Sequence, residues 1–323
     1  MTADAAPLLE VVDLHTHFET AEGVGRAVDG VSFTVDAGRT LGILGESGCG
    51  KSVTALSILR LVSLPGRIVS GSIRYRGRDL LQLSERDMRA VRGGEIAMVF
   101  QEPMTSLNPV FTIGNQIGEA VRLHQNLSGA AVRARVIEAL RTVEIPEPER
   151  RAKSYPHELS GGMRQRAMIA MALACEPSLL IADEPTTALD VTIQAQILEL
   201  LRGLRDSLGM AVVLITHDLG IVAEQADDVA VMYAGRIVER ASAIELFEHP
   251  LHPYTVALLK AGRQRHGDGQ RLEALPGTVP SLFRRPSGCR FRDRCAMAIA
   301  ECADVDPVLE EKTPGHEAAC IRV

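Results

Sequence analysis

The 323-residue sequence predicts an α/β fold with a mostly helical insert and a small C-terminal region. Short apolar runs alternate with long segments of helical spacing, which favours parallel strands buried on both faces. The apolar run at residues 41–44 leads directly into a glycine-rich segment. After Pro250 the composition changes, because prolines, glycines and cysteines become frequent.

The expected strands can be taken in chain order. Val31, Phe33 and Val35 alternate with polar neighbours, as in a half-buried strand. Shorter apolar runs follow at residues 41–44, 96–100, 179–182 and 211–215. Residues 229–239 predict two strands folded about Ala234 and Gly235. We expect this hairpin to close the sheet.

The helical insert is expected over residues 104–175, which lack a strong strand pattern. Within it, residues 131–143 carry apolar side chains at helical spacing. The predicted domains are a core domain over 1–250, which contains the insert, and a C-terminal extension over 251–323.

Composition and charge exclude several classes of protein. A net charge of -6 and the absence of tryptophan make nucleic acid a poor partner. The longest apolar run, residues 167–175, is far shorter than the roughly 20 residues that cross a bilayer. The N-terminal residues also lack the pattern of a secretory signal. We therefore expect a cytoplasmic protein without a membrane span.

A glycine-rich run after the 41–44 strand carries the clearest chemistry. It fits GxxxxGK[ST] and consists of Gly45, Glu46, Ser47, Gly48, Cys49, Gly50, Lys51 and Ser52. The glycines let backbone N–H groups point at a β-phosphate. Lys51 is expected to neutralise the β- and γ-phosphates and Ser52 to bind Mg²⁺. The alternative is a glycine-rich turn that only ends a strand, but the strand before and the helix after favour nucleotide binding.

An acidic pair follows the 179–182 strand. Asp183 is expected to hold Mg²⁺ through water, and Glu184 to polarise the water that attacks the γ-phosphate. Taken alone, such a pair is more often a helix N-terminal cap.

A third motif changes this balance: Leu159 is followed by Ser160, Gly161, Gly162 and Met163, ahead of a helical stretch. With this LSGG run, the sequence resembles the ATP-binding cassette (ABC) family of P-loop NTPases over nearly its whole length. The segments QEPMTSLNP, YPHELSGGMRQR, ADEPTTALDVT and EHPLHPYT are similar to the ATPase subunits of bacterial oligopeptide and dipeptide importers.

The resemblance implies how the signature works. Ser160, Gly161 and Gly162 would form an anion-binding concavity at a helix N-terminus. The sequence has no second nucleotide motif for them to serve, so they are expected to act on the ATP of a second ABC ATPase stacked head to tail. Met163 replaces the glutamine common at the end of this signature, and we expect function to survive because the serine and glycines make the phosphate contacts.

Four further roles come from the resemblance. His217 would contact the γ-phosphate, Gln101 would touch the metal or the attacking water, Asp190 would lie at the dimer interface and Phe18 would stack on adenine. Each has a structural alternative: a hydrogen-bonding histidine, a surface glutamine, a helix cap and a buried strand aromatic. For Cys49 the alternatives are a reactive thiolate and a tolerated small side chain.

The resemblance also implies partners and a location. It predicts an ATP-hydrolysing subunit of an importer, peripheral on the cytoplasmic face of the inner membrane. Its partners would be a second ABC ATPase, favoured as a paralogue, two transmembrane permease subunits and an extracytoplasmic substrate-binding protein. Because those partners select the substrate, nickel chelates and other small solutes remain alternatives to peptides.

The sequence disfavours two other classes of function. A soluble ABC ATPase acting on DNA or ribosomes would be favoured by tandem cassettes, coiled-coil arms or basic patches, and none is visible in the sequence. A regulatory module that binds ATP but barely hydrolyses it is disfavoured by the intact Lys51, Asp183, Glu184 and His217.

The C-terminal cysteines are the last predicted site. Cys289, Cys295, Cys302 and Cys320 lie in a segment with little capacity for a core of its own. Four thiolates suit either tetrahedral zinc or a [4Fe–4S] cluster, and the lack of a C-x2-C pair weakens zinc. The resemblance favours the iron–sulfur cluster in a structural role, with unligated thiols as a third alternative.

Overall fold

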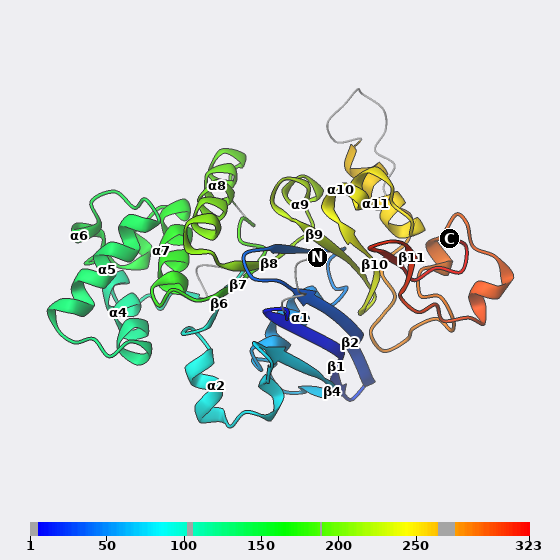
Figure 1. The fold of residues 1–323 in the computed structure, drawn as a ribbon, viewed down its shortest axis with the longest axis horizontal. Helices are drawn as coiled ribbons and strands as arrows, with labels where there is room; N and C mark the ends of the chain where they lie inside the picture. Colours follow the sequence, from blue (N-terminus) through cyan, green and yellow to red (C-terminus); the bar gives the residue numbers. More distant parts are fainter. Residues whose placement is uncertain (1–5, 102–105, 188, 264–274) are drawn as a thin grey trace. The chain divides into compact units, whose positions relative to one another are not determined.

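The computed structural model describes residues 6–101, 106–187, 189–263 and 275–323. Its contacts divide the chain into two compact units. Unit 1 comprises residues up to Leu81 and from Leu214 onward, and unit 2 comprises Gln82–Val213. Figure 1 traces the helices and strands of both units along the chain. None of the described helices is both long and apolar enough to cross a membrane.

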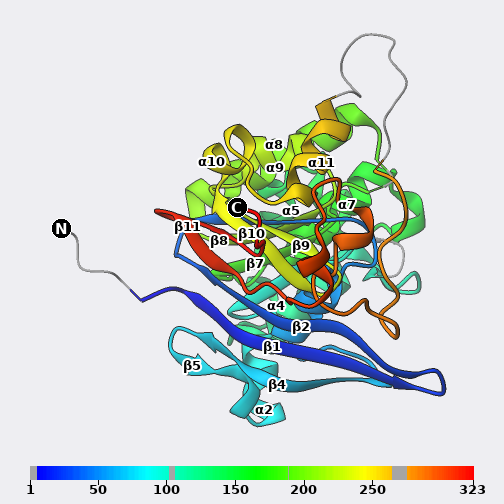
Figure 2. The same ribbon diagram turned by 90° about the vertical axis from the view of Figure 1, so that its right-hand side faces the viewer.

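Unit 1 contains an antiparallel sheet with the strand order β2-β1-β4-β5. Its strands are β1 (Leu9–Thr20), β2 (Gly23–Val35), β4 (Gly66–Tyr75) and β5 (Arg78–Asp79). Figure 2 shows them in blue and cyan. Val31, Phe33 and Val35 of β2 are buried while Ser32 and Thr34 are exposed. The alternation read from the sequence is thus confirmed as the end of a longer strand.

The strands of the second sheet that lie in unit 1 run in the order β11-β12-β10-β9-β3. Its strands are β3 (Thr40–Leu44), β9 (Asp228–Tyr233), β10 (Arg236–Ser242), β11 (Glu310–Thr313) and β12 (His316–Ala318). All of β3 is buried, and it pairs in parallel with β9. β9 and β10 form the expected hairpin about Ala234 and Gly235.

That hairpin does not close the sheet, however, because β12 pairs with the outer side of β10. The reason lies in Glu239 of β10, which is fully buried. Its carboxylate accepts the backbone N–H groups of Leu251 and His252, and its Oε1 lies 2.7 Å from Nε2 of His316 on β12. A buried carboxylate needs such partners, and the C-terminal strand supplies one.

The helices of unit 1 are α1 (Lys51–Ile58), α9 (Leu219–Gln225), α10 (Ala243–Glu248) and α11 (Pro253–Arg263), with 3-10 turns η4 (Arg292–Arg294) and η5 (Ala300–Ala303). Residues beyond 250 share a core with the rest of the unit. Tyr254 and Phe291 pack against Tyr233, with ring centroids 4.6 and 5.3 Å from it. The domain boundary at residue 250 stays a prediction.

Unit 2 combines strands with a long run of helices. Its elements are α2 (Glu85–Val91), β6 (Ile96–Val99), α4 (Ile113–His124), α5 (Ala130–Thr142), α6 (Pro148–Arg151), η2 (Pro156–Glu158), α7 (Gly161–Leu173), β7 (Leu179–Asp183) and α8 (Val191–Leu208). β6 and β7 are parallel. β8 (Ala211–Thr216) begins in unit 2 and ends in unit 1, and η1 (Leu80–Gln82) also spans the division. Among the described residues of the 104–175 insert, α4 to α7 and η2 occur and no strand does.

Candidate functional site

The predicted phosphate-binding loop lies between β3 and α1 in unit 1. Gly48 and Gly50 have φ angles of 78° and 112°, which side chains other than glycine rarely adopt. A Cβ atom on Gly50 would also lie 2.4 Å from the carbonyl oxygen of Ala27. Glycine therefore allows the tight turn into the helix, the backbone arrangement that an anion-binding loop requires.

Lys51 begins helix α1, and its ammonium group is held against the loop. Its Nζ donates to the carbonyl oxygens of Gly45 at 2.7 Å and Glu46 at 3.0 Å. Lys51 is only 5% exposed. Ser52 follows as the second residue of the helix. A positive charge at a helix N-terminus, next to a glycine-rich loop, suits the binding of a phosphate group.

Cys49 is a buried core residue of this loop. It has no exposed surface, and burial, opposed by the charge of Lys51, raises the pKa of its thiol. Its carbonyl oxygen accepts the backbone N–H of Gly235 at 2.8 Å. The structure thus favours the tolerated side chain over the reactive thiolate.

In unit 2 the acidic pair and Gln101 come together. Asp183 ends β7 and is 5% exposed. Oε2 of Glu184 accepts hydrogen bonds from Nε2 of Gln101 at 3.1 Å and from Oγ1 of Thr187 at 2.8 Å. Glu184 has a φ of 47°, a left-handed conformation that costs free energy for a residue with a side chain. The two hydrogen bonds restrain a carboxylate next to the strand end, and a carboxylate is a group that can polarise a water molecule.

The LSGG signature begins helix α7. Ser160 is its N-cap and accepts the backbone N–H of Met163 at 3.3 Å. Gly161 and Gly162 form the first turn, and a Cβ atom on Gly162 would lie 2.9 Å from the Ile193 side chain. The serine and two glycines therefore occupy the positive end of a 13-residue helix, where an anion is stabilised.

The remaining predicted residues occupy definite places. Asp190 caps α8 by accepting the N–H of Ile193 at 2.9 Å, in agreement with the capping alternative. His217 is exposed and directly follows β8. Phe18, on β1, is half-buried opposite Gly66, where a Cβ atom would lie 2.6 Å from its ring. The predicted site residues thus fall into two sets. Phe18, the loop 45–52 and His217 lie in unit 1, while Gln101, Ser160–Met163, Asp183, Glu184 and Asp190 lie in unit 2.

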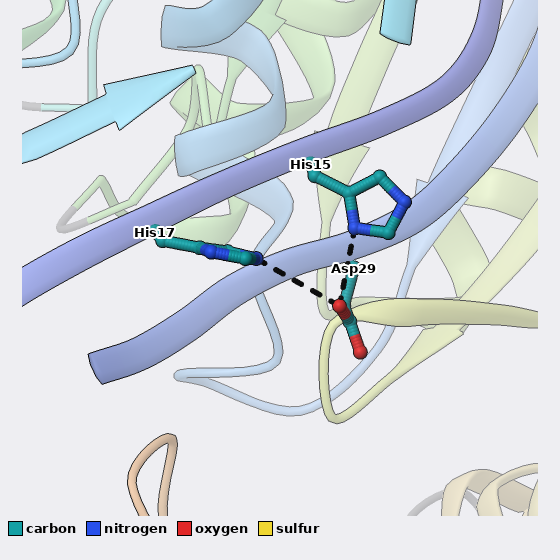
Figure 3. Close-up of side chains that lie close together, drawn as sticks. All are labelled: His15, His17 and Asp29. Carbon is teal, nitrogen blue, oxygen red and sulfur yellow. Dashed lines mark hydrogen bonds and ion pairs between the residues drawn. The ribbon is translucent and has the colours of Figure 1, made fainter. Parts of the chain in front are cut away.

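A group with metal-ligand chemistry lies outside these sets. Figure 3 shows His15 and His17 of β1 directed at Asp29 of β2, and their ligand atoms all lie within 4.8 Å of one another. Asp29, however, also binds the guanidinium groups of Arg285 and Arg290. These arginines repel a divalent cation and already neutralise the carboxylate, so the group is better explained as an ion-pair anchor.

The four C-terminal cysteines line one small cavity in unit 1, together with Phe291 and other residues. Burial raises the pKa of the Cys289 and Cys295 thiols; backbone hydrogen bonds oppose this shift, and the neighbouring cysteines add to it. No three of the four sulfurs all lie within 4.8 Å of one another. Among the described residues, only His15, His17 and Asp29 form a group that compact. Zinc–sulfur bonds of about 2.3 Å would hold four sulfurs within roughly 4 Å. The four thiols thus line one cavity, but among the described residues their sulfurs do not form the compact group that a single zinc ion requires.

Comparisons with known proteins identify the family. Residues 28–187 match the ABC transporter family, and residues 238–302 match the C-terminal region of oligopeptide/dipeptide transporters. The chain is 60% identical over 317 residues to the probable peptide ABC transporter ATP-binding protein y4tR of Sinorhizobium fredii, covering 98% of this chain and 95% of that relative. It is 50% identical to the dipeptide transport ATP-binding protein DppD of Escherichia coli, over 97% and 96% of the two chains. The chain belongs to the ABC transporter family.

Solved ABC cassettes share its fold. One is the dimeric post-hydrolysis state of the ATP-binding cassette MJ0796 bound to ADP and Pi, with a TM-score of 0.66, 27% identity and coverage of 73% of this chain and 98% of that one. Another is cbiO1 of Clostridium perfringens, part of the ABC transporter complex cbiONQ, with a TM-score of 0.64, 27% identity and coverage of 78% and 94%. The predicted family, P-loop NTPase fold and ATPase class are confirmed.

The structure adds residues to this ABC ATPase site that the motifs did not single out. Thr187 contacts Glu184, and Nε2 of Gln165 donates to the carbonyl oxygen of Pro185, so α7 contacts the loop that carries Glu184. Tyr254 and Arg294 contact the phosphate-binding loop. Thr187 and Gln165 lie within or beside the quoted motifs, whereas nothing in the local sequence marks the other two.

Proposed function

We propose that this ABC ATPase powers the uptake of oligopeptides or dipeptides across the cytoplasmic membrane. The observation that carries the proposal is the near full-length identity to relatives named for peptide and dipeptide transport, together with the match of residues 238–302 to the oligopeptide/dipeptide transporter C-terminal region. Nickel chelates and other small solutes are the alternative substrates.

In the proposed hydrolysis, the two sets of residues have separate tasks. Lys51 and the loop backbone bind the β- and γ-phosphates of ATP, while Ser52 and Asp183 hold Mg²⁺, which neutralises charge on the phosphates. Glu184 orients and polarises the attacking water, and its hydrogen bond with Gln101 supports a joint role at that water or at the metal. His217 contacts the γ-phosphate.

The signature is proposed to act on a partner's ATP. Ser160, Gly161 and Gly162 present the start of α7 to an anion, and Asp190 lies at the same interface. Phe18 stacks on the adenine. Two ABC ATPases, this chain and a paralogue, would then enclose ATP head to tail, and loss of the γ-phosphate would separate them.

Coupling to transport requires membrane partners. The chain is proposed to bind two permease subunits at the cytoplasmic face of the inner membrane, with a substrate-binding protein on the other side. Opening and closing of the ATPase pair would switch the permeases between inward and outward states.

The test is to purify the chain with its permeases, reconstitute the complex in vesicles and measure ATP hydrolysis with the binding protein and a panel of substrates. We expect stimulation by di- or oligopeptides. Stimulation by a nickel chelate alone would overturn the peptide assignment, and failure to bind any permease would favour a non-transport ABC ATPase.

We further propose that Cys289, Cys295, Cys302 and Cys320 hold a [4Fe–4S] cluster. All four line one cavity, which supports a shared ligand, with zinc and unligated thiols as the alternatives. Such a cluster would cross-link the C-terminal segment and give it a fixed shape, without taking part in ATP hydrolysis.

A further inference from the structure

Glu46 in the phosphate-binding loop is held from three directions. Its backbone N–H donates to the hydroxyl oxygen of Tyr254 at 3.0 Å. Its carbonyl oxygen accepts from Nζ of Lys51 at 3.0 Å. Its carboxylate accepts two hydrogen bonds from Arg294, at 2.6 and 3.0 Å. Tyr254 and Arg294 lie 208 and 248 residues away in the sequence, beyond the ABC transporter match.

Both outside partners are themselves fixed. The Arg294 side chain is 5% exposed, lies 5.7 Å from the ring centroid of Tyr233 and donates from Nε to the carbonyl oxygen of Pro276. Tyr254 is fully buried, and burial raises the pKa of its hydroxyl, so it stays neutral. Its ring packs against Tyr233 and Phe291. A two-point guanidinium–carboxylate pair on such a support restricts the Glu46 side chain strongly.

The charge of Glu46 matters because of where it lies. Glu46 is part of the loop that is proposed to receive the ATP phosphates, and Lys51 donates to its carbonyl oxygen and to that of Gly45. The Glu46 carboxylate therefore lies on the loop itself. An unpaired carboxylate there would repel the triphosphate. Pairing with Arg294 removes this repulsion, and the Tyr254 hydrogen bond fixes the backbone at the start of the loop.

We propose that Arg294 and Tyr254 are positioning residues for ATP: the C-terminal extension neutralises Glu46 and holds the phosphate-binding loop in its binding conformation. The inference rests on the proposed binding of ATP at this loop. It makes nucleotide affinity a property of the extension as well as of the cassette.

The test is Mg-ATP binding by the full-length chain, measured by titration calorimetry, for Arg294→Ala, Tyr254→Phe and the double variant Glu46→Gln/Arg294→Ala. We expect about tenfold weaker binding for Arg294→Ala, in line with the loss of a charge-assisted pair. The double variant should recover most of that loss, because glutamine does not repel phosphate. Tyr254→Phe, which keeps the buried ring, should weaken binding about threefold.

Arg292→Ala is the matched control. Arg292 lies in the same turn but donates to the carbonyl oxygens of Ser287 and Ala303, within the extension. It should leave ATP affinity within twofold of the wild type.

Each other outcome has a definite meaning. Wild-type affinity in Arg294→Ala, or equal losses in the Arg292 and Arg294 variants, would overturn the positioning role. If the double variant bound Mg-ATP as weakly as Arg294→Ala, the neutralisation of Glu46 would be overturned. This holds even if Arg294→Ala also lowers the stability of the protein. Absence of ATP binding by the wild-type chain would instead refute the proposed ATP site itself.

Discussion

The phosphate-binding loop of unit 1 and the carboxylate loop of unit 2 are built in different ways. The first is buried and shaped by backbone: Cys49 has no exposed surface, and Gly50 turns against the carbonyl oxygen of Ala27. The second carries Glu184, a half-buried side chain that receives hydrogen bonds from Gln101 and Thr187. In the proposed function, ATP binding therefore depends on a preformed backbone, whereas hydrolysis depends on the direction of one side chain.

This contrast indicates which substitutions should impair ATP binding and which should impair hydrolysis. A backbone-built loop tolerates changes in side chains that do not shape it, such as the cysteine at position 49. A site that depends on one side chain, as proposed for Glu184 in hydrolysis, should lose its activity when that carboxylate is replaced. Substitutions in the two regions should therefore separate affinity from turnover.

Glu184→Gln should have the largest effect. It keeps the shape of the side chain but removes its charge, so turnover should fall at least about 100-fold while ATP binding persists. Phosphate release and Mg-ATP binding by the wild type and the variant check this. Glu199→Gln, on the exposed side of α8, is the control and should hydrolyse ATP normally. Turnover near the wild-type rate in Glu184→Gln would exclude this residue as the catalytic carboxylate.

Lys51→Ala should act on the other function. Removal of an ammonium group held at the loop should weaken ATP binding by about 100-fold. The measurement is the same titration, with the exposed Lys153→Ala as a charge-matched control. Unchanged affinity would contradict the role of residues 45–52 and with it the contrast between the two regions.

Local sequence predicted those parts of the molecule whose chemistry is contiguous. The loop 45–52 and its flanking strand and helix follow from short-range pattern, and so does the hairpin of β9 and β10. The end of the sheet was mispredicted because the partner of Glu239 is His316, 77 residues away. The ion pair between Arg294 and Glu46 could not be predicted either, because only the fold brings this one of many arginines to the loop.

Cys295→Ser tests what keeps the extension beside the phosphate-binding loop. The wild type, purified without oxygen, should be brown and contain iron and sulfide, and the variant should lose both and unfold more easily. Cys175→Ser is the control, because that thiol lies in unit 2 and should not affect metal content. Colourless protein with one zinc per chain would select the alternative, and metal-free folded protein would reject both.

The smallest effect is expected from Asp29, the second anchor of the extension. Burial alone would raise its pKa, but Arg290, Arg285 and Arg236 outweigh this and lower it from 3.8 to about 2. Because the folded-state pKa is the lower one, folding favours the carboxylate. This adds about 2 kcal/mol of stability, present above pH 4 and lost as the pH falls towards 2.

Asp29→Asn should therefore destabilise the chain at neutral pH, and its deficit relative to the wild type should shrink between pH 5 and pH 3. Urea unfolding across that range measures this. His15 and His17 also face Asp29. Burial lowers the pKa of His17 while the charge of Asp29 raises it, so the difference between the two proteins includes the coupling of Asp29 to these histidines. Asp306→Asn, which removes the exposed partner of Arg236, is the control and should cost less than about 1 kcal/mol. A deficit that does not change with pH would show that Asp29 acts through packing rather than charge. The extension would then be anchored to the rest of unit 1 electrostatically at Glu46 but not at Asp29.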